Sequence, residues 1–254
     1  FDDISDDFNL KNLSVKSEAI LHAELTNILS KELNKHVLVV PRVYSDEIIN
    51  NDNYIADFCK NINKENSIFY CGKKIVAATQ SLEEVKTITN ISNNKVILWD
   101  NLYANDYCPT KIFLGPYIRR YNLINVMVNL TGMIETDLFL LDLISLTSAS
   151  NKNDINWLNI LKKHNIPKQF LIISEYFYPV NFINYKTQKS IDYNKELEAL
   201  DYLLWKWKTP LSREWYQYFL ILKQCLQLLN NDLNNDRIRK IFPLPLKNTL
   251  INNK

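Results

Sequence analysis

The residues most able to do chemistry gather between Val96 and Tyr117. Four consecutive apolar residues, Val96 to Trp99, indicate a short buried strand. Polar side chains follow this strand directly: Asp100, Asn101, Asn105, Asp106 and Tyr107. Carboxylates and carboxamides at the carboxyl end of a buried parallel strand are typical of an α/β barrel active site. A capped strand with a polar turn accounts for the same residues without chemistry, because Asn and Asp are common in turns.

The second candidate is the pair of adjacent carboxylates at Asp2 and Asp3, which follow the apolar Phe1. Neighbouring side chains on a strand point to opposite faces, so two such residues can serve one site only where the strand has just ended. A solvated acidic terminus is the alternative, because Asp6 and Asp7 continue the run of negative charge. The residue pattern alone leaves both interpretations open.

Composition excludes several function classes. The 30 basic and 28 acidic residues nearly balance, so the sequence offers no basic patch of the kind that nucleic acid binding needs. No apolar run is long enough to span a membrane, and no spacing of His, Asp and Glu indicates a metal site. The four cysteines are widely spread, which is typical of isolated thiols in a reducing compartment and favours a cytoplasmic location.

Periodicity predicts the elements that must position these residues. Residues 12–33 show helical spacing, and the packing stripe of this helix is expected to consist of Leu21, Leu25, Ile28 and Leu29. Ser81 opens a capping box for a second helix that runs through Thr89. Apolar and β-branched runs predict further strands over residues 37–40, 67–72 and 125–132. Strands that alternate with helices indicate an α/β fold.

From about Leu138 onward the pattern predicts helices only. Thr209 and Pro210 read as a cap and a first-turn proline for a long helix. Its apolar seam recurs at heptad-like spacing through Trp215, Phe219, Leu222, Leu226 and Leu229. The change of pattern divides the chain into an α/β segment over residues 1–147 and an all-α segment over residues 148–254.

Several segments, read in order, resemble one known family. The motifs Trp-Asp-Asn, Asn-Asp-Tyr and Leu-Gly-Pro-Tyr between Trp99 and Tyr117 are similar to the seventh strand and loop of glycoside hydrolase family 84, which includes the protein O-GlcNAcases. The Phe1-Asp2-Asp3 segment resembles the catalytic strand end of that family, and Pro41 to Tyr44 resembles the end of its fifth strand. The resemblance implies a partial (β/α)8 TIM barrel, strands four to eight, followed by a helical stalk.

The resemblance also implies a reaction. It is the hydrolysis of a terminal N-acetylglucosamine with retention of configuration, in which the substrate's own acetamido oxygen attacks the anomeric carbon and forms an oxazoline. Asp2 would polarise the 2-acetamido group, and Asp3 would be the general acid and base. Asp106 would hold the outer sugar hydroxyls, and the other substrate-binding residues would be Tyr44, Trp99, Asn101 and Tyr107. Neither a cofactor nor a metal would be needed.

Implied partners are an N-acetylglucosamine-bearing glycoprotein or glycan, the remaining N-terminal half of the barrel, and a second copy of the chain bound through the stalk. Two departures from the family pattern leave an alternative open. Tyr70 and Cys71 replace the Trp-Thr that usually precedes Gly72, and Thr136 is expected where the family has a sugar-binding Asn. A catalytically weakened relative that only binds glycans is therefore the alternative function, and an assembly domain built on the aromatic helices is a third.

Overall fold

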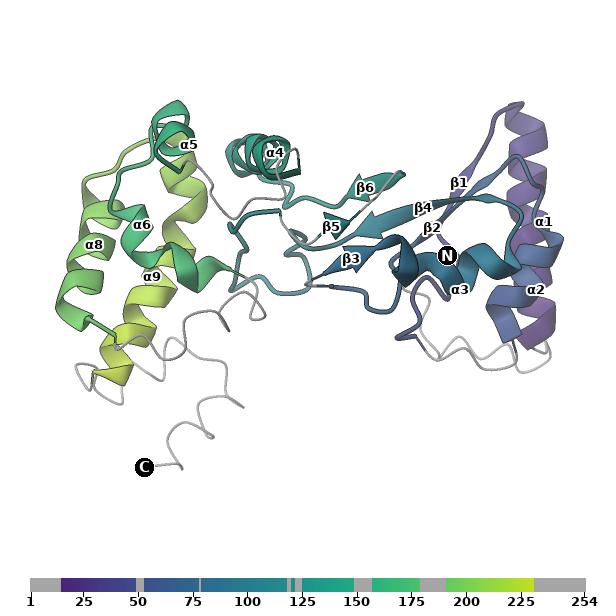
Figure 1. Ribbon diagram of the computed structural model, residues 1–254, viewed down its shortest axis with the longest axis horizontal. Coiled ribbons are helices and arrows are strands. Elements are labelled where there is room, and N and C mark those ends of the chain that lie inside the picture. Colours follow the sequence, from purple (N-terminus) through teal and green to yellow (C-terminus); the bar gives the residue numbers. More distant parts are fainter. Residues whose placement is uncertain are drawn as a thin grey trace. The chain divides into compact units, whose positions relative to one another are not determined.

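The computed structural model describes residues 15–48, 53–77, 79–117, 120–121, 125–148, 157–178 and 191–230 (Figure 1). These residues form two compact units. The first unit takes the described residues up to Ala104 and those within 118–130, and the second takes Asn105–Tyr117 and the described residues from Thr131 onward. The two units divide the chain differently from the expected segments, because Asn105–Tyr117 belongs with the helices; a domain boundary after residue 147 stays a prediction.

The first unit is built on a parallel sheet with the strand order β1-β2-β4-β6 (Figure 1). Its strands are β1 (Leu38–Val39), β2 (Ser67–Tyr70), β4 (Lys95–Asp100) and β6 (Val126–Val128). The central strands pair from Ser67 opposite Lys95, and Leu98 lies opposite Val126. All four predicted strands are therefore confirmed, although β1 and β6 are shorter than predicted. Because the strands are parallel, their carboxyl ends meet at one edge of the sheet.

A second, smaller parallel sheet joins β3 (Gln80–Ser81) to β5 (Arg120–Tyr121). Gln80 lies opposite Arg120 in this pair. After β3 the chain continues as a 3₁₀ turn, η2 (Leu82–Val85), and then as the helix α3 (Lys86–Ile91). The Ser81 side chain makes no capping hydrogen bond, so the predicted capping box is wrong. Ser81 is the last residue of β3, and the turn that follows it is 3₁₀ and not α-helical.

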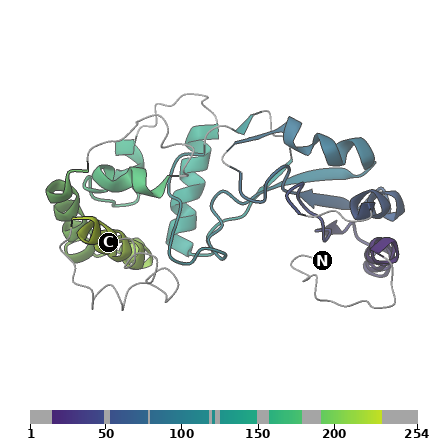
Figure 2. The ribbon, with the colours of Figure 1, turned by 90° about the horizontal axis from the view of Figure 1, so that it is seen from below.

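The helices α1 (Val15–Leu33) and α2 (Tyr54–Asn61) lie side by side in both views (Figures 1 and 2). The predicted helix is confirmed, but its predicted packing stripe is wrong. The buried face of α1 consists of Ala19, Ala23 and neighbouring residues, whereas the predicted stripe is 40–55% exposed: Leu21, Leu25, Ile28 and Leu29. Small residues let two helices approach closely, so α1 turns its alanines toward the core and its leucines outward.

The second unit is helical throughout its described elements. It contains α4 (Ile134–Ser148), α5 (Trp157–Lys163), α6 (Phe170–Ile173), the 3₁₀ turn η3 (Ser174–Phe177), α8 (Tyr193–Trp205) and α9 (Pro210–Leu229). The predicted cap of α9 is confirmed: the Thr209 hydroxyl accepts a hydrogen bond from the Ser212 backbone N–H, and Pro210 is the first helical residue. Thr209 and Ser212 together form a capping box, which satisfies two backbone N–H groups at the start of the helix.

The core of the second unit is a cluster of aromatic rings around Trp215. The ring centroids of Phe139 and Phe170 lie 5.3 and 5.2 Å from that of Trp215, and Phe219 lies at 5.8 Å. All four side chains are almost fully buried, so this cluster joins α4, α6 and α9. Edge-to-face and tilted contacts of this kind each contribute about 1 kcal/mol beyond area burial. The heptad-like seam is thus partly confirmed, since Trp215, Phe219 and Leu226 are buried and Leu229 is exposed.

Candidate active site

The candidate site lies at the carboxyl end of β4, where Trp99, Asp100 and Asn101 leave the sheet in succession. Trp99 packs against Tyr44 at 5.7 Å and against Phe69 at 6.2 Å between ring centroids. The structure thus brings two of the predicted substrate-binding residues, Tyr44 and Trp99, into contact. The indole Nε1 of Trp99 is buried and has no hydrogen-bond partner among the described residues. Tyr44, Phe69 and Trp99 thus form an apolar aromatic wall, in which the Trp99 indole N–H is a hydrogen-bond donor without a partner among the described residues.

Asn101 is held by three hydrogen bonds. Its amide nitrogen donates to the Cys71 sulfur at 3.3 Å and to the Ile75 carbonyl at 3.1 Å. Its amide oxygen accepts from the Asn129 side chain at 3.2 Å. Because both ends of the amide are engaged, its orientation is defined by its partners. Asn101 is only 6% exposed, so it acts as the buried link between the loop after β2 and the end of β6.

Asn129 joins the candidate site, although the sequence patterns did not single it out. It follows β6 directly, and its backbone N–H donates to the Asp100 carbonyl at 2.9 Å. Its side chain reaches Asn101 and is half-buried, so it stands at the same sheet edge as the residues from β4. A signal was present in the sequence, because an Asn directly after the apolar run Val126–Val128 repeats the pattern of Trp99-Asp100-Asn101.

Thr136, which was predicted to stand in place of a sugar-binding Asn, has its hydroxyl fully engaged within the helical unit. Thr136 lies in α4 of the second unit and has no exposed surface. Its hydroxyl donates to the Glu214 carboxylate at 2.6 Å and accepts from the Trp215 indole at 2.9 Å. The same carboxylate accepts the backbone N–H of Thr136, as expected for an anion at the first turn of a helix. Thr136 thus anchors α4 to α9, and the polar residue after β6 is Asn129.

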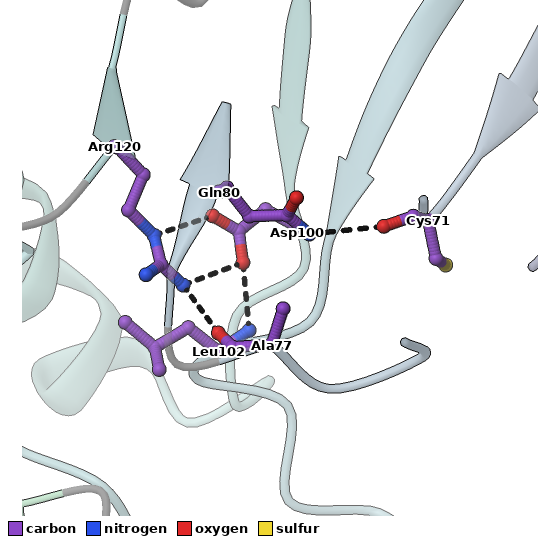
Figure 3. A network of polar contacts seen from close by, with 6 residues as sticks. All are labelled: Cys71, Ala77, Gln80, Asp100, Leu102 and Arg120. Atoms are coloured by element: carbon purple, nitrogen blue, oxygen red, sulfur yellow. Dashed lines mark hydrogen bonds and ion pairs between the residues drawn. The ribbon is translucent and has the colours of Figure 1, made fainter. Parts of the chain in front are cut away.

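A buried ion pair underlies the site (Figure 3). The Arg120 Nε donates to Asp100 at 2.9 Å, and the side chains of Arg120 and Asp100 are 3% and 0% exposed. Asp100 also accepts the backbone N–H of Leu102 at 3.1 Å. Arg120 in turn donates to the Ala77 carbonyl at 2.9 Å. The pair is fully enclosed by protein, so it cannot contact a substrate, and its role lies in holding the neighbouring backbone.

The remaining predicted residues are placed elsewhere or lie outside the described residues. Asp106 and Tyr107 are exposed and belong to the second unit, where the preceding Asn105 donates to the Tyr218 hydroxyl at 3.0 Å. The Asp106 carboxylate accepts the backbone N–H of Tyr107 at 3.0 Å. Asp2 and Asp3 lie outside the described residues. The structure therefore groups Tyr44, Trp99 and Asn101 with Asn129, and it describes Asp106 and Tyr107 separately.

Two further properties bear on function. Within the described ranges, no three His, Cys, Asp or Glu side chains gather closely enough to hold a metal ion. Among the helices that the structure describes, none combines the length and the apolar character needed to cross a membrane.

Comparison with protein families identifies the chain. The profile of a family described as β-N-acetylglucosaminidase matches residues 1–137, which is more than half of the 254 residues. The chain belongs to glycoside hydrolase family 84. The match contains the aromatic wall of Tyr44, Phe69 and Trp99 and the linked amides of Asn101 and Asn129. It also contains Asp2 and Asp3.

Individual relatives of this family 84 chain are distant. A stretch of 50 residues is 34% identical to the protein O-GlcNAcase of Rattus norvegicus and equally to that of Mus musculus, and it makes up 20% of this chain and 6% of each relative. The solved structure of CpGH84B superposes with a TM-score of 0.60 at 16% identity, over 92% of this chain and 51% of that one. This likeness shows the fold, and the chain spans about half the length of that structure.

Proposed function

We propose that this family 84 chain contributes to a β-N-acetylglucosaminidase that removes terminal N-acetylglucosamine from glycoproteins or glycans. The observation that carries the proposal is the meeting of Tyr44, Trp99, Asn101 and Asn129 at one edge of a parallel sheet. Side chains for catalysis and binding leave α/β sheets at that edge. The family match, which extends over the adjacent carboxylates Asp2 and Asp3, supports the same reaction.

The reaction proceeds with help from the substrate itself. The acetamido oxygen attacks the anomeric carbon while Asp3 donates a proton to the leaving oxygen, so the glycosidic bond breaks and an oxazoline forms. Asp2 accepts a hydrogen bond from the acetamido N–H and stabilises its developing positive charge. Asp3, now ionised, then removes a proton from water, which attacks the anomeric carbon and restores the acetamido group. The sugar therefore leaves with its original configuration.

Binding is divided among the other residues. Tyr44 and Trp99 form the aromatic surface beside the acetamido group, which suits its apolar methyl. Asn129, which is half-buried, offers its amide to the sugar, and the hydrogen bond from its side chain to the buried Asn101 fixes its orientation. The family resemblance assigns the outer hydroxyls to Asp106, an exposed residue, and names the exposed Tyr107 as a further substrate-binding residue. Each hydrogen bond of this kind to a sugar hydroxyl is worth about 1 kcal/mol, and more when the carboxylate is charged.

The test is hydrolysis of an aryl N-acetyl-β-glucosaminide by the full-length protein. Asp3→Ala removes the general acid and is expected to lower kcat/KM by at least about 100-fold. Asp7→Ala is the matched control, because Asp7 is a neighbouring carboxylate without a proposed role, and it should retain wild-type activity. Equal activity of wild type and Asp3→Ala, or equal losses in both variants, would show that the carboxylate pair is only an acidic terminus.

Glycan binding without turnover is the second candidate function. It is favoured by Cys71, a departure from the family pattern that contacts Asn101 directly. A protein that binds an oxazoline mimic tightly, and does not hydrolyse the aryl glycoside at any pH between about 4 and 9, would establish this function in place of the first. Absence of both binding and turnover would leave assembly through the aromatic helices.

The first unit also offers an interface for the other half of a barrel. Among the described residues β1 pairs only with β2, so its other edge is open, and Leu38 in it is 56% exposed. The exposed stripe of α1 consists of leucine and isoleucine side chains. Open edges and apolar helix faces are normally covered in α/β folds. We infer that further strand–helix units of the same barrel cover both.

A further inference from the structure

We propose that the small sheet β3–β5 is a positioning device for the candidate site, with Arg120 as its central residue. The pair brings Gln80 and Arg120 next to each other, and neither side chain has a place in the proposed reaction. Both reach instead to the segments that follow the site strands (Figure 3). The consequence for catalysis rests on the proposed function, whereas the holding of the backbone can be measured without it.

The Arg120 side chain binds two segments of the chain at once. Its guanidinium binds both oxygens of Asp100, with Nε at 2.9 Å from one and Nη2 at 3.1 Å from the other. The same Nη2 donates to the Ala77 carbonyl at 2.9 Å. Asp100 ends β4 and Ala77 lies in the segment after β2, so one side chain ties together the segments that leave the two central strands. A planar fork of fixed donors suits this task, and a single ammonium does not.

These contacts extend to Asn101 and to a residue that accepts its hydrogen bond. Asp100 accepts the backbone N–H of Leu102 at 3.1 Å, which closes the turn that contains Asn101. On the other segment, the Gln80 amide donates to the Cys71 carbonyl at 2.9 Å. Cys71 and Ile75 are the two acceptors of the Asn101 amide. The β3–β5 sheet therefore holds the turn that contains Asn101 through Asp100, and it holds one acceptor of the Asn101 amide, Cys71, through Gln80.

Because these side chains are buried, their contacts are rigid, and the loss of one contact would lower the stability of the fold. Arg120 and Asp100 are 3% and 0% exposed, and Gln80 is 2% exposed. Removing one partner of such a pair leaves a buried uncompensated charge and destabilises the fold, whereas replacing both by apolar residues is often neutral. A double substitution therefore separates the holding of the loops from the stability of the unit.

The experiment compares wild type with Asp100→Val/Arg120→Met in the full-length protein. Valine suits a strand and methionine approximates the length of arginine, so the melting temperature should stay within a few degrees of wild type. Amide hydrogen exchange over residues 101–104 and 72–77 should become at least about tenfold faster, with α2 as the unchanged internal control. Affinity for an oxazoline mimic and kcat/KM should both fall at least about tenfold, because misplacement of about 1 Å costs that much or more.

A second variant, Arg120→Lys, guards against loss of folding. It keeps a cation beside Asp100 but replaces the fork by one donor group, so exchange over residues 72–77 should again be faster than in wild type. Wild-type exchange in both variants would overturn the proposal. So would faster exchange with unchanged affinity and turnover, because the site would then not depend on the held segments. Faster exchange in the variants, together with a wild type that neither binds nor hydrolyses, would confirm the holding of the loops and refute the proposed function.

Discussion

At the scale of the residue, His22 shows how a polar group is kept in the core. Its Nδ1 lies 2.7 Å from the Tyr54 hydroxyl, which itself accepts the backbone N–H of Arg42 at 3.2 Å. A neutral His22 ring can exchange this hydrogen bond with the Tyr54 hydroxyl without placing a charge in the core. Burial, assisted by the charge of Arg42, lowers the pKa of His22 from 6.5 to about 4. In the folded chain the His22 ring is therefore neutral at neutral pH.

This shift predicts a pH dependence of stability. Between pH 6.5 and about 4 the unfolded chain takes up a proton at His22 and the folded chain does not, so the free energy of unfolding falls as the pH falls through this window. The loss reaches up to about 3 kcal/mol. His22→Gln lacks this titration, so the difference between wild type and variant should shrink by that amount from pH 7 to 4 in denaturant titrations. A difference in the free energy of unfolding that stays the same from pH 7 to 4 would contradict the lowered pKa of His22.

Single residues also mark what sequence could and could not predict about the site. Trp99 and Asn101 were predicted because they lie at the end of an apolar run, and the structure places them at the strand end. Asn129 follows an equally apolar run, but the family pattern directed the prediction to Thr136 instead. Arg120 matches an Arg of the family pattern, but its contacts with Asp100 and Ala77 could not be predicted, because only the folded sheet brings these residues near it. The periodicity of a sequence does not indicate which residues contact each other across a sheet.

At the scale of the element, α1 carries the clearest disagreement between periodicity and packing. Spacing alone finds an apolar stripe, but it cannot tell which of two apolar faces meets the core. The alanine face packs inward because the contact with α2 is close, and the leucine face is left at the surface. Exposed apolar stripes of this length are typical of interfaces, which agrees with the proposed cover by further units of the barrel. The sequence therefore predicted the helix correctly and the direction of its face wrongly.

If further units of the barrel cover that face, charge should not be tolerated there. Leu25→Glu/Ile28→Glu in the full-length protein should lower the free energy of unfolding by at least about 2 kcal/mol, because two carboxylates would be buried without partners. Glu24→Gln is the matched control, since Glu24 is an exposed residue of the same helix, and it should stay within about 0.5 kcal/mol of wild type. Denaturant unfolding measures both. A double variant as stable as wild type would mean that the stripe faces solvent.

At the scale of the whole molecule, the second unit presents an aromatic patch suited to self-association. Tyr202, Trp205 and Tyr216 are 42%, 51% and 37% exposed, and the rings of Trp205 and Tyr216 meet edge to face at 6.0 Å. They come from α8 and α9, which pack side by side (Figures 1 and 2). Exposed Tyr and Trp are enriched where proteins bind each other. We therefore propose that this patch would form the contact of the homodimer that the family resemblance implies.

The dimer is expected to depend on Trp205, the most exposed of the three rings. Trp205→Glu replaces an aromatic anchor by a charge and should raise the dissociation constant at least about 30-fold, since anchors of this kind contribute about 2 kcal/mol or more. Lys206→Glu changes the charge of the adjacent exposed residue and should leave the dimer intact. Light scattering coupled to size exclusion measures the mass of each. A wild-type protein with the mass of a single chain would show that it does not self-associate. Equal dissociation of both variants would mean that Trp205 is not the anchor of the dimer, because the loss of an anchor weakens binding more than a change at the rim does.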